Sequence, residues 1–174
     1  MNTPTHNEKL AVLKDILASW VISIIFISIS YRASFHVKFF NELTSQKSCA
    51  LALLLAALSL ALGIGWAART RHLKSNIDGS APKFGEPLEI TLRYVSNTYE
   101  QLLLFALACI ALNFIAPETA VRLLPVMGLW FMIARIIFWA GYKTHPLKRA
   151  IGFAATFHPT LVLMAFSAYK LVSG

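Results

Sequence analysis

The amino-acid sequence predicts an all-α integral membrane protein, and three observations carry that prediction. Hydrophobic residues make up 57% of the 174 residues and charged residues 14%, where a soluble domain carries about 25% charge. The mean hydropathy is +0.61, and the apolar residues fall in runs close to the ~20 residues that cross ~30 Å of hydrocarbon. Leu and Ala dominate these runs, as from Ala50 to Leu58, whereas a transmembrane β-barrel needs short strands of alternating polarity.

Five segments have the length and composition of membrane-spanning helices: roughly 14–32, 48–67, 96–116, 121–142 and 150–171. The first follows Lys9 and Lys14, which is the basic start that a signal peptide also has. Its apolar core is longer than that of a signal peptide, however, and Ser28 to Arg32 makes a poor cleavage site. We therefore expect an uncleaved helix.

The connections between the spans also follow from the sequence. Residues 33–47 form a short linker whose aromatic side chains suit the membrane interface. Residues 68–92 are the longest polar stretch, and Pro87 within it suits the first turn of a helix that begins before the membrane. The connection at 116–119 is very short, so the third and fourth spans should form an antiparallel hairpin. The last connection, at 143–149, is also short.

The net charge is +8, but the distribution of the basic residues argues against nucleic-acid binding. These residues are spread between the apolar runs, which is the pattern of side chains that orient membrane helices. Ten of the 16 Lys and Arg residues lie on the side of the amino terminus and of the loops at 68–92 and 143–149, and five lie on the opposite side. The positive-inside rule therefore places the amino terminus and these two loops in the cytoplasm.

A row of polar residues opens the third span. Arg93, Asn97 and Glu100 are spaced by four and three residues, which places them on one face of a helix. Ionisable groups are costly inside a membrane helix and mark a functional site by default. These three residues are called the first polar row below.

A second row, Arg135, Phe138 and Tyr142, lies on the fourth span. Glu100 is seven residues inside Arg93, and Arg135 is seven residues inside Tyr142, so each offset is roughly 10 Å. Because the two spans form a hairpin, Glu100 and Arg135 are expected at a similar depth. An acid and a base at equal depth in a low-dielectric bundle are natural partners in an ion pair.

Further basic residues stand near the same expected membrane face. Lys148 and Arg149 begin the last span, and Arg69 and Arg71 end the second. Together with both polar rows they predict a pocket that faces the cytoplasm and suits a small polyanion with an amine. Arginine binds carboxylates through a bidentate fork, and Glu100 suits an ammonium group. An arginine beside a thiol also favours the nucleophilic thiolate.

Neither the cysteines nor the histidines indicate a metal site or a disulfide. Cys49 and Cys109 lie near or within apolar spans and have no ligand partner at short spacing, so both are expected to fill space. His72, His145 and His158 are scattered and show no metal-ligand spacing.

Two motifs resemble one known family. The segment 93–100 is similar to the R-x-x-x-N-x-x-E signature of the MAPEG proteins, which are membrane-associated proteins of eicosanoid and glutathione metabolism. The segment 134–142 is similar to that family's A-R-x-x-x-x-x-G-Y stretch, and Arg149 falls at the spacing of the catalytic arginine in its leukotriene-forming members. The resemblance covers about residues 47–172 and carries a polar loop of the right kind between the first two family helices.

The resemblance implies a left-handed four-helix bundle with one extra transmembrane helix before it. Residues 1–46 would hold the polar amino terminus, the extra helix and a linker, and residues 47–174 would form the four-helix domain. It also implies a homotrimer that binds glutathione, as co-substrate, between subunits near the cytoplasmic face. Arg149 would stabilise the glutathione thiolate, and either Arg69 or Arg71 could take the place of the family's basic residues after its first helix. Carried over by position, five residues would bind glutathione: Arg93, Asn97, Glu100, Arg135 and Tyr142.

Three functions are weighed against one another. The first is a glutathione-dependent transferase and peroxidase that acts on lipophilic electrophiles or hydroperoxides from the membrane lipid. The second is a non-catalytic membrane scaffold that retains the bundle. It gains weight because Phe138 stands where leukotriene-forming members have a tyrosine that helps to hold glutathione. The third, a small transporter, is weaker because neither broken helices nor paired repeats are visible.

Overall fold

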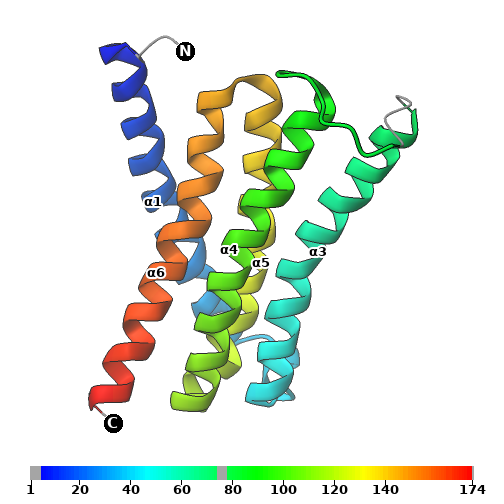
Figure 1. The fold of residues 1–174 in the computed structure, drawn as a ribbon. Coiled ribbons are helices and arrows are strands. Elements are labelled where there is room, and N and C mark those ends of the chain that lie inside the picture. The colour runs from blue at the N-terminus through cyan, green and yellow to red at the C-terminus, as the bar shows by residue number, and fades with distance from the viewer. Residues whose placement is uncertain (1–4, 74–77, 174) are drawn as a thin grey trace.

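The fold is that of a computed structural model, which describes residues 5–73 and 78–173. Its elements are helical throughout the described ranges (Figure 1): α1 (His6–Ser34), α2 (Lys38–Asn41), α3 (Ser45–Leu73), α4 (Pro87–Ile115), α5 (Pro117–Thr144), the 3-10 turn η1 (Pro146–Lys148) and α6 (Arg149–Ser173). The five long helices are each apolar and long enough to cross a membrane, so the chain is a multi-pass integral membrane protein.

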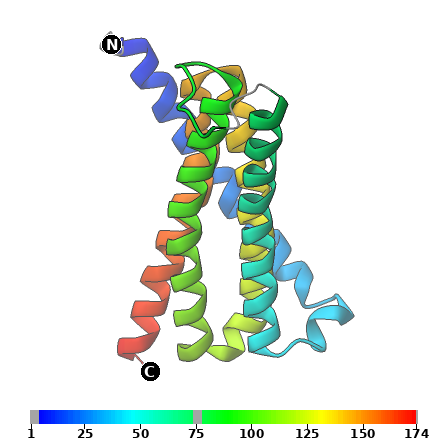
Figure 2. The same cartoon turned by 45° about the vertical axis from the view of Figure 1, so that its right-hand side comes forward.

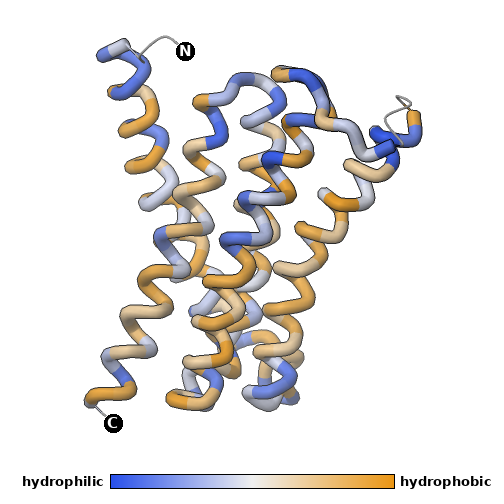
Figure 3. The backbone as a smooth tube through the Cα atoms, viewed as in Figure 1, coloured by the Kyte–Doolittle hydropathy of each residue, from blue (hydrophilic) through white to orange (hydrophobic). Residues whose placement is uncertain are grey.

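All five predicted spans are confirmed, and each observed helix is longer than its prediction. The third gains the longest extension at one end, because Pro87 opens α4 well before the apolar run begins. Figure 3 shows why the predictions stopped short: the apolar colouring ends before the helices do, and polar turns continue beyond it. The linker at 33–47 also contains one element that the sequence did not predict, the short helix α2.

Helix α5 is the centre of the bundle and α1 is its periphery. α5 contacts α1, α3, α4 and α6, and 56% of its most apolar stretch is buried, compared with 11% for α1. Figures 1 and 2 show α3 to α6 as one bundle with α1 lying obliquely against its side. The start of α1, the described residues that lead into α4 and the connection between α5 and α6 all lie at one end, which is uppermost in Figure 1.

Two glycines allow the helices around α5 to approach closely. A Cβ atom on Gly128 would collide with the backbone of Ala52 on α3, and one on Gly152 of α6 would collide with the backbone of Phe138 on α5. Small residues at helix contacts are the usual means of tight packing in membranes. The second contact fixes α6 against the part of α5 that carries the second polar row.

Candidate functional site

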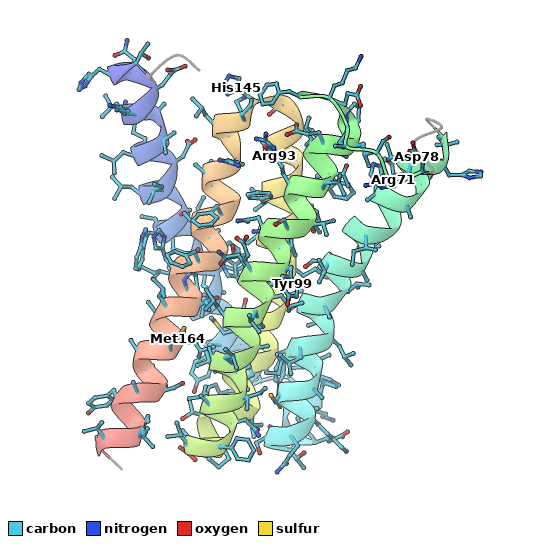
Figure 4. The ribbon with its side chains drawn as sticks, viewed as in Figure 1. Arg71, Asp78, Arg93, Tyr99, His145 and Met164 are labelled. Carbon is cyan, nitrogen blue, oxygen red and sulfur yellow. The ribbon has the colours of Figure 1, made fainter. Side chains whose placement is uncertain are left out.

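The two polar rows meet at the end of the bundle that holds the connection between α5 and α6. Arg93, labelled in Figure 4 near this end, donates a hydrogen bond from its Nη1 to the Tyr142 hydroxyl over 3.1 Å. It also forms an ion pair with Glu89, one turn earlier on α4. Tyr142 is buried, and the guanidinium carbon of Arg149 lies 5.2 Å from the centroid of its ring. Tyr142 therefore lies between two arginines from different helices.

Arg135 is the most deeply buried charge of the site, with 0% of its surface exposed. Its three nitrogens bind three neutral side chains. Nη2 donates to Asn97 Oδ1 over 3.0 Å, Nε to Thr98 Oγ1 over 3.1 Å and Nη1 to Thr156 Oγ1 over 3.4 Å. These partners come from α4 and α6, so Arg135 on α5 joins three helices. No carboxylate among the described residues forms an ion pair with it.

The expected ion pair between Glu100 and Arg135 is therefore wrong. Glu100 is exposed on the outer face of α4, and the reason is rotation rather than depth. Thr98 is fully buried and turned toward Arg135. Glu100 lies two residues further on, which turns it about 200° around the helix axis. The rise per residue predicted only the depth of Glu100 in the bundle, and it did not predict which way its side chain points around the helix axis.

Phe138, which has no hydroxyl to bind a ligand, packs its ring against Arg135. Its buried ring lies 4.1 Å from the guanidinium carbon of Arg135, and the Tyr94 ring lies 5.4 Å from the same carbon. An arginine held over an aromatic face gains a cation–π attraction, which is stronger where water is excluded. Phe138 thus steadies Arg135 and offers no hydrogen bond to a ligand.

Arg149 is exposed at the start of α6 and lines a cavity of about 430 Å³. Asn97 and Phe138 lie in the same wall, and the remaining lining is mostly apolar, from α6, η1 and α1. Gly141 permits this arrangement, because a Cβ atom there would collide with the Lys148 carbonyl. Asn97 and Arg149, both selected from the sequence, therefore line one cavity.

Two predicted basic residues lie elsewhere. The Arg69 guanidinium carbon lies 5.5 Å from the ring centroid of Trp66 on α3 itself. Arg71 donates to the Ser80 carbonyl over 3.5 Å, and Figure 4 shows it near Asp78 at the end of α3. Neither side chain lines the cavity at Arg149.

Sequence reasoning missed the two threonines that hold Arg135. Thr98 lies inside the recognised motif but was treated as a spacer, although its neighbour Asn97 was selected. Thr156 had only one signal, a hydroxyl within an apolar run, and such hydroxyls usually bond to their own helix. The Thr156 hydroxyl accepts the hydrogen bond from Arg135 and also donates one to the Phe153 carbonyl of its own helix over 2.9 Å. Across the described ranges, no group of three or more His, Cys, Asp or Glu residues lies close enough to hold a metal ion.

Comparison with known proteins gives one family and two distant relatives. The sequence model of the MAPEG family matches residues 48–169. Transmembrane protein 79 of Mus musculus is 29% identical over 91 residues, and the same protein of Bos taurus is 30% identical over 91 residues. Each alignment covers 51% of this chain and 23% of the relative, so the chain spans about a quarter of the length of these proteins. No solved structure matches.

Proposed function

The chain belongs to the MAPEG family, and we propose on that basis that it is a glutathione-dependent membrane transferase that also acts as a peroxidase. The observation that carries this proposal is an excess of positive charge at membrane depth. Arg135 is fully buried with only neutral hydrogen-bond partners, and Arg149 lines the adjacent cavity. Such unneutralised charge is costly in a low-dielectric bundle, and an anionic ligand would offset that cost.

Glutathione supplies the complementary groups. Its two carboxylates suit Arg93 and Arg149, because guanidinium groups bind carboxylates in a fork. Its ammonium suits the exposed carboxylate of Glu100. Tyr142 and Asn97 would offer neutral hydrogen bonds, and Arg135 would act through Asn97, whose side-chain oxygen it holds. Every one of these roles is a proposal for this chain.

Arg149 is the proposed catalytic residue. A cation beside the glutathione sulfur lowers the pKa of the thiol and increases the fraction of thiolate. In transfer, the sulfur lone pair forms a bond to the electrophilic carbon and the leaving group departs with its electron pair. In the peroxidase reaction, thiolate attack on the outer hydroperoxide oxygen releases an alcohol. A second glutathione then displaces water and forms the disulfide.

A homotrimer completes this proposal. Glu100 is exposed on one chain, yet it lies on a helix that crosses the membrane, where lipid would not solvate it. The exposed Arg93 lies on the same face of α4, seven residues earlier. A neighbouring subunit laid against this face of α4 would cover both side chains and close a ligand site between subunits. The loops at this end are placed in the cytoplasm by the positive-inside rule, and that orientation stays a prediction.

The test is glutathione binding and conjugation by the purified full chain in detergent. Thiolate formation is followed by its ultraviolet absorbance, and conjugation by transfer to a lipophilic aryl halide. We expect Arg149→Ala to lower kcat/KM about a hundredfold, as loss of a transition-state charge partner does. Lys148→Ala is the matched control, because it removes the adjacent charge from a position that does not line the cavity. Equal activity in both variants and the wild type would refute the site.

A non-catalytic scaffold is the second candidate, and one observation favours it. All three guanidinium nitrogens of Arg135 already have partners inside the chain, as expected of a group that locks helices together. This alternative predicts no thiolate absorbance when glutathione is added to the wild type. It also predicts that Glu100→Gln disrupts the trimer without any change in thiol chemistry.

A further inference from the structure

Helix α1 lies outside the segment matched by the family model, yet it forms one wall of the cavity at Arg149. Val12 and Ile16 of α1 line the cavity opposite Phe153 and Phe157 of α6. Of the polar members, Asn97 and Arg149 come from the candidate site itself and His158 from α6. The cavity is therefore amphipathic, with the proposed reaction centre in one part and an aliphatic and aromatic slot in the other.

Helix α1 is anchored to the bundle at several points from Trp20 onward, just beyond the residues that line the cavity. Trp20 stacks on His158 of α6 with ring centroids 4.7 Å apart, and Phe26 packs on Trp130 of α5 at 4.8 Å. At the far end of α1, Arg122 donates to the Ser34 carbonyl over 2.6 Å. Between these points, Ser19 and Ser23 are buried and direct their hydroxyls to carbonyls of α1 itself, which leaves small side chains at the contact.

We infer that this slot binds the apolar tail of the electrophile, so that α1 selects co-substrates with a long unbranched chain. The inference rests on the proposed function, because Arg149 would hold the thiolate at one end of the same cavity. The volume of about 430 Å³ lies within the range of about 300–1,000 Å³ that small-molecule sites occupy. The occupant needs one polar, reactive end beside Arg149 and Asn97, and an apolar remainder between Ile16 and Phe153.

Nonenal, a long-chain α,β-unsaturated aldehyde, has this shape and serves as the probe. The glutathione sulfur donates its electron pair to the β-carbon, and the carbon–carbon π pair moves through the carbonyl to give an enolate. The α-carbon then takes a proton from water, so atoms and electrons balance without a redox partner. Crotonaldehyde carries the same reactive group with almost no tail. Its rate of conjugation therefore measures the chemical step without any contribution from tail binding in the slot.

Filling the slot separates tail binding from chemistry. Ile16→Trp places an indole into the cavity. Leu17→Trp places the same group at a residue that is 57% exposed and does not line the cavity. For nonenal we expect Ile16→Trp to lower kcat/KM about tenfold, as the lost contact of about two methylenes predicts. For crotonaldehyde the change should stay within about twofold, and Leu17→Trp should leave both aldehydes unaffected. Equal losses for both aldehydes, or no loss for either, would overturn the inference.

A second measurement is independent of catalysis. A saturated long-chain aldehyde that carries an alkyl diazirine is photolysed with the wild-type chain, and labelled peptides are identified by mass spectrometry. Labels on α1 near Ile16 and on α6 near Phe153, suppressed by excess nonenal, support the slot even if no conjugation is found. Conjugation by a wild type whose labels lie elsewhere refutes the slot and leaves the proposed function standing. If Ile16→Trp fails to fold, Val12→Trp replaces it, and a change of oligomeric state in either variant also refutes the slot.

Discussion

Replacing Arg135 by methionine should leave the bundle more stable than replacing it by lysine. The reasoning starts from the three neutral acceptors at 3.0, 3.1 and 3.4 Å from its nitrogens. A lysine ammonium is a single point and cannot reach acceptors on two different helices as a planar fork does. It would therefore keep the buried charge and lose most of the hydrogen bonds that compensate for it.

Methionine removes the charge together with its desolvation cost. Thr98 and Thr156 stay satisfied, because they also donate to the Tyr94 carbonyl over 2.6 Å and the Phe153 carbonyl over 2.9 Å. Only the Asn97 oxygen loses its partner, which costs about 1–3 kcal/mol. Lysine loses two charged hydrogen bonds at about 1.5–3 kcal/mol each, so it should be the less stable variant by about 2 kcal/mol.

The assay is thermal unfolding of the wild type, Arg135→Met and Arg135→Lys in one detergent at one protein concentration. A difference of about 2 kcal/mol corresponds to a Tm about 4–8 °C lower for Arg135→Lys in a chain of this size. A Tm for Arg135→Met at or below that of Arg135→Lys would refute the reasoning. It would mean that the positive charge is neutralised in the folded protein by a carboxylate from outside this chain.

Three further substitutions and one control test the geometry. Gly152→Ala should lower Tm by several degrees, because its Cβ would meet the Phe138 backbone and overpacking costs about 1–3 kcal/mol; Gly65→Ala, where nothing lies within 4 Å, should be neutral or stabilising in the same melts. Tyr142→Phe removes the acceptor of Arg93, so binding titrations should show weaker glutathione affinity with Tm nearly unchanged. Glu100→Gln should shift the trimer toward smaller species in size-exclusion chromatography with light scattering, and unchanged mass would contradict the covered α4 face.

The membrane fold was predictable because the bilayer sets both the length and the apolarity of every span. Helix ends were less predictable: hydropathy reports where hydrocarbon begins, whereas α4 continues from Pro87 through polar turns such as that of Arg93. The division of the chain after residue 46 also came from the resemblance and stays a prediction. The linker helix α2 is only four residues long, too short for any periodic pattern.

The sequence indicated which parts of the two helices come together but not which side chains pair. Spacing alone brought Asn97 and Arg135 into one region, and the hydrogen bond between them is observed. Pairing depends on the rotation of α4 about its axis, and a shift of two residues turns a side chain to nearly the opposite face. The contribution of α1 was unpredictable for another reason. Val12 and Ile16 look like ordinary lipid-facing residues until the tilt of α1 brings them to the cavity.

The composition of the last three helices explains why Arg135 has only neutral partners. From residue 90 to the carboxyl terminus the chain contains two acidic residues, Glu100 and Glu118. Glu118 is 17 residues from Arg135 on the same helix, which is roughly 26 Å away, and Glu100 is turned outward. Glu89, in the first turn of α4, already pairs with Arg93, so among the described residues of these helices no carboxylate forms an ion pair with Arg135 or Arg149. An anionic ligand in the cavity or a carboxylate of a second subunit would supply the missing negative charge, and the Arg135→Met comparison, made without added ligand, tests the second.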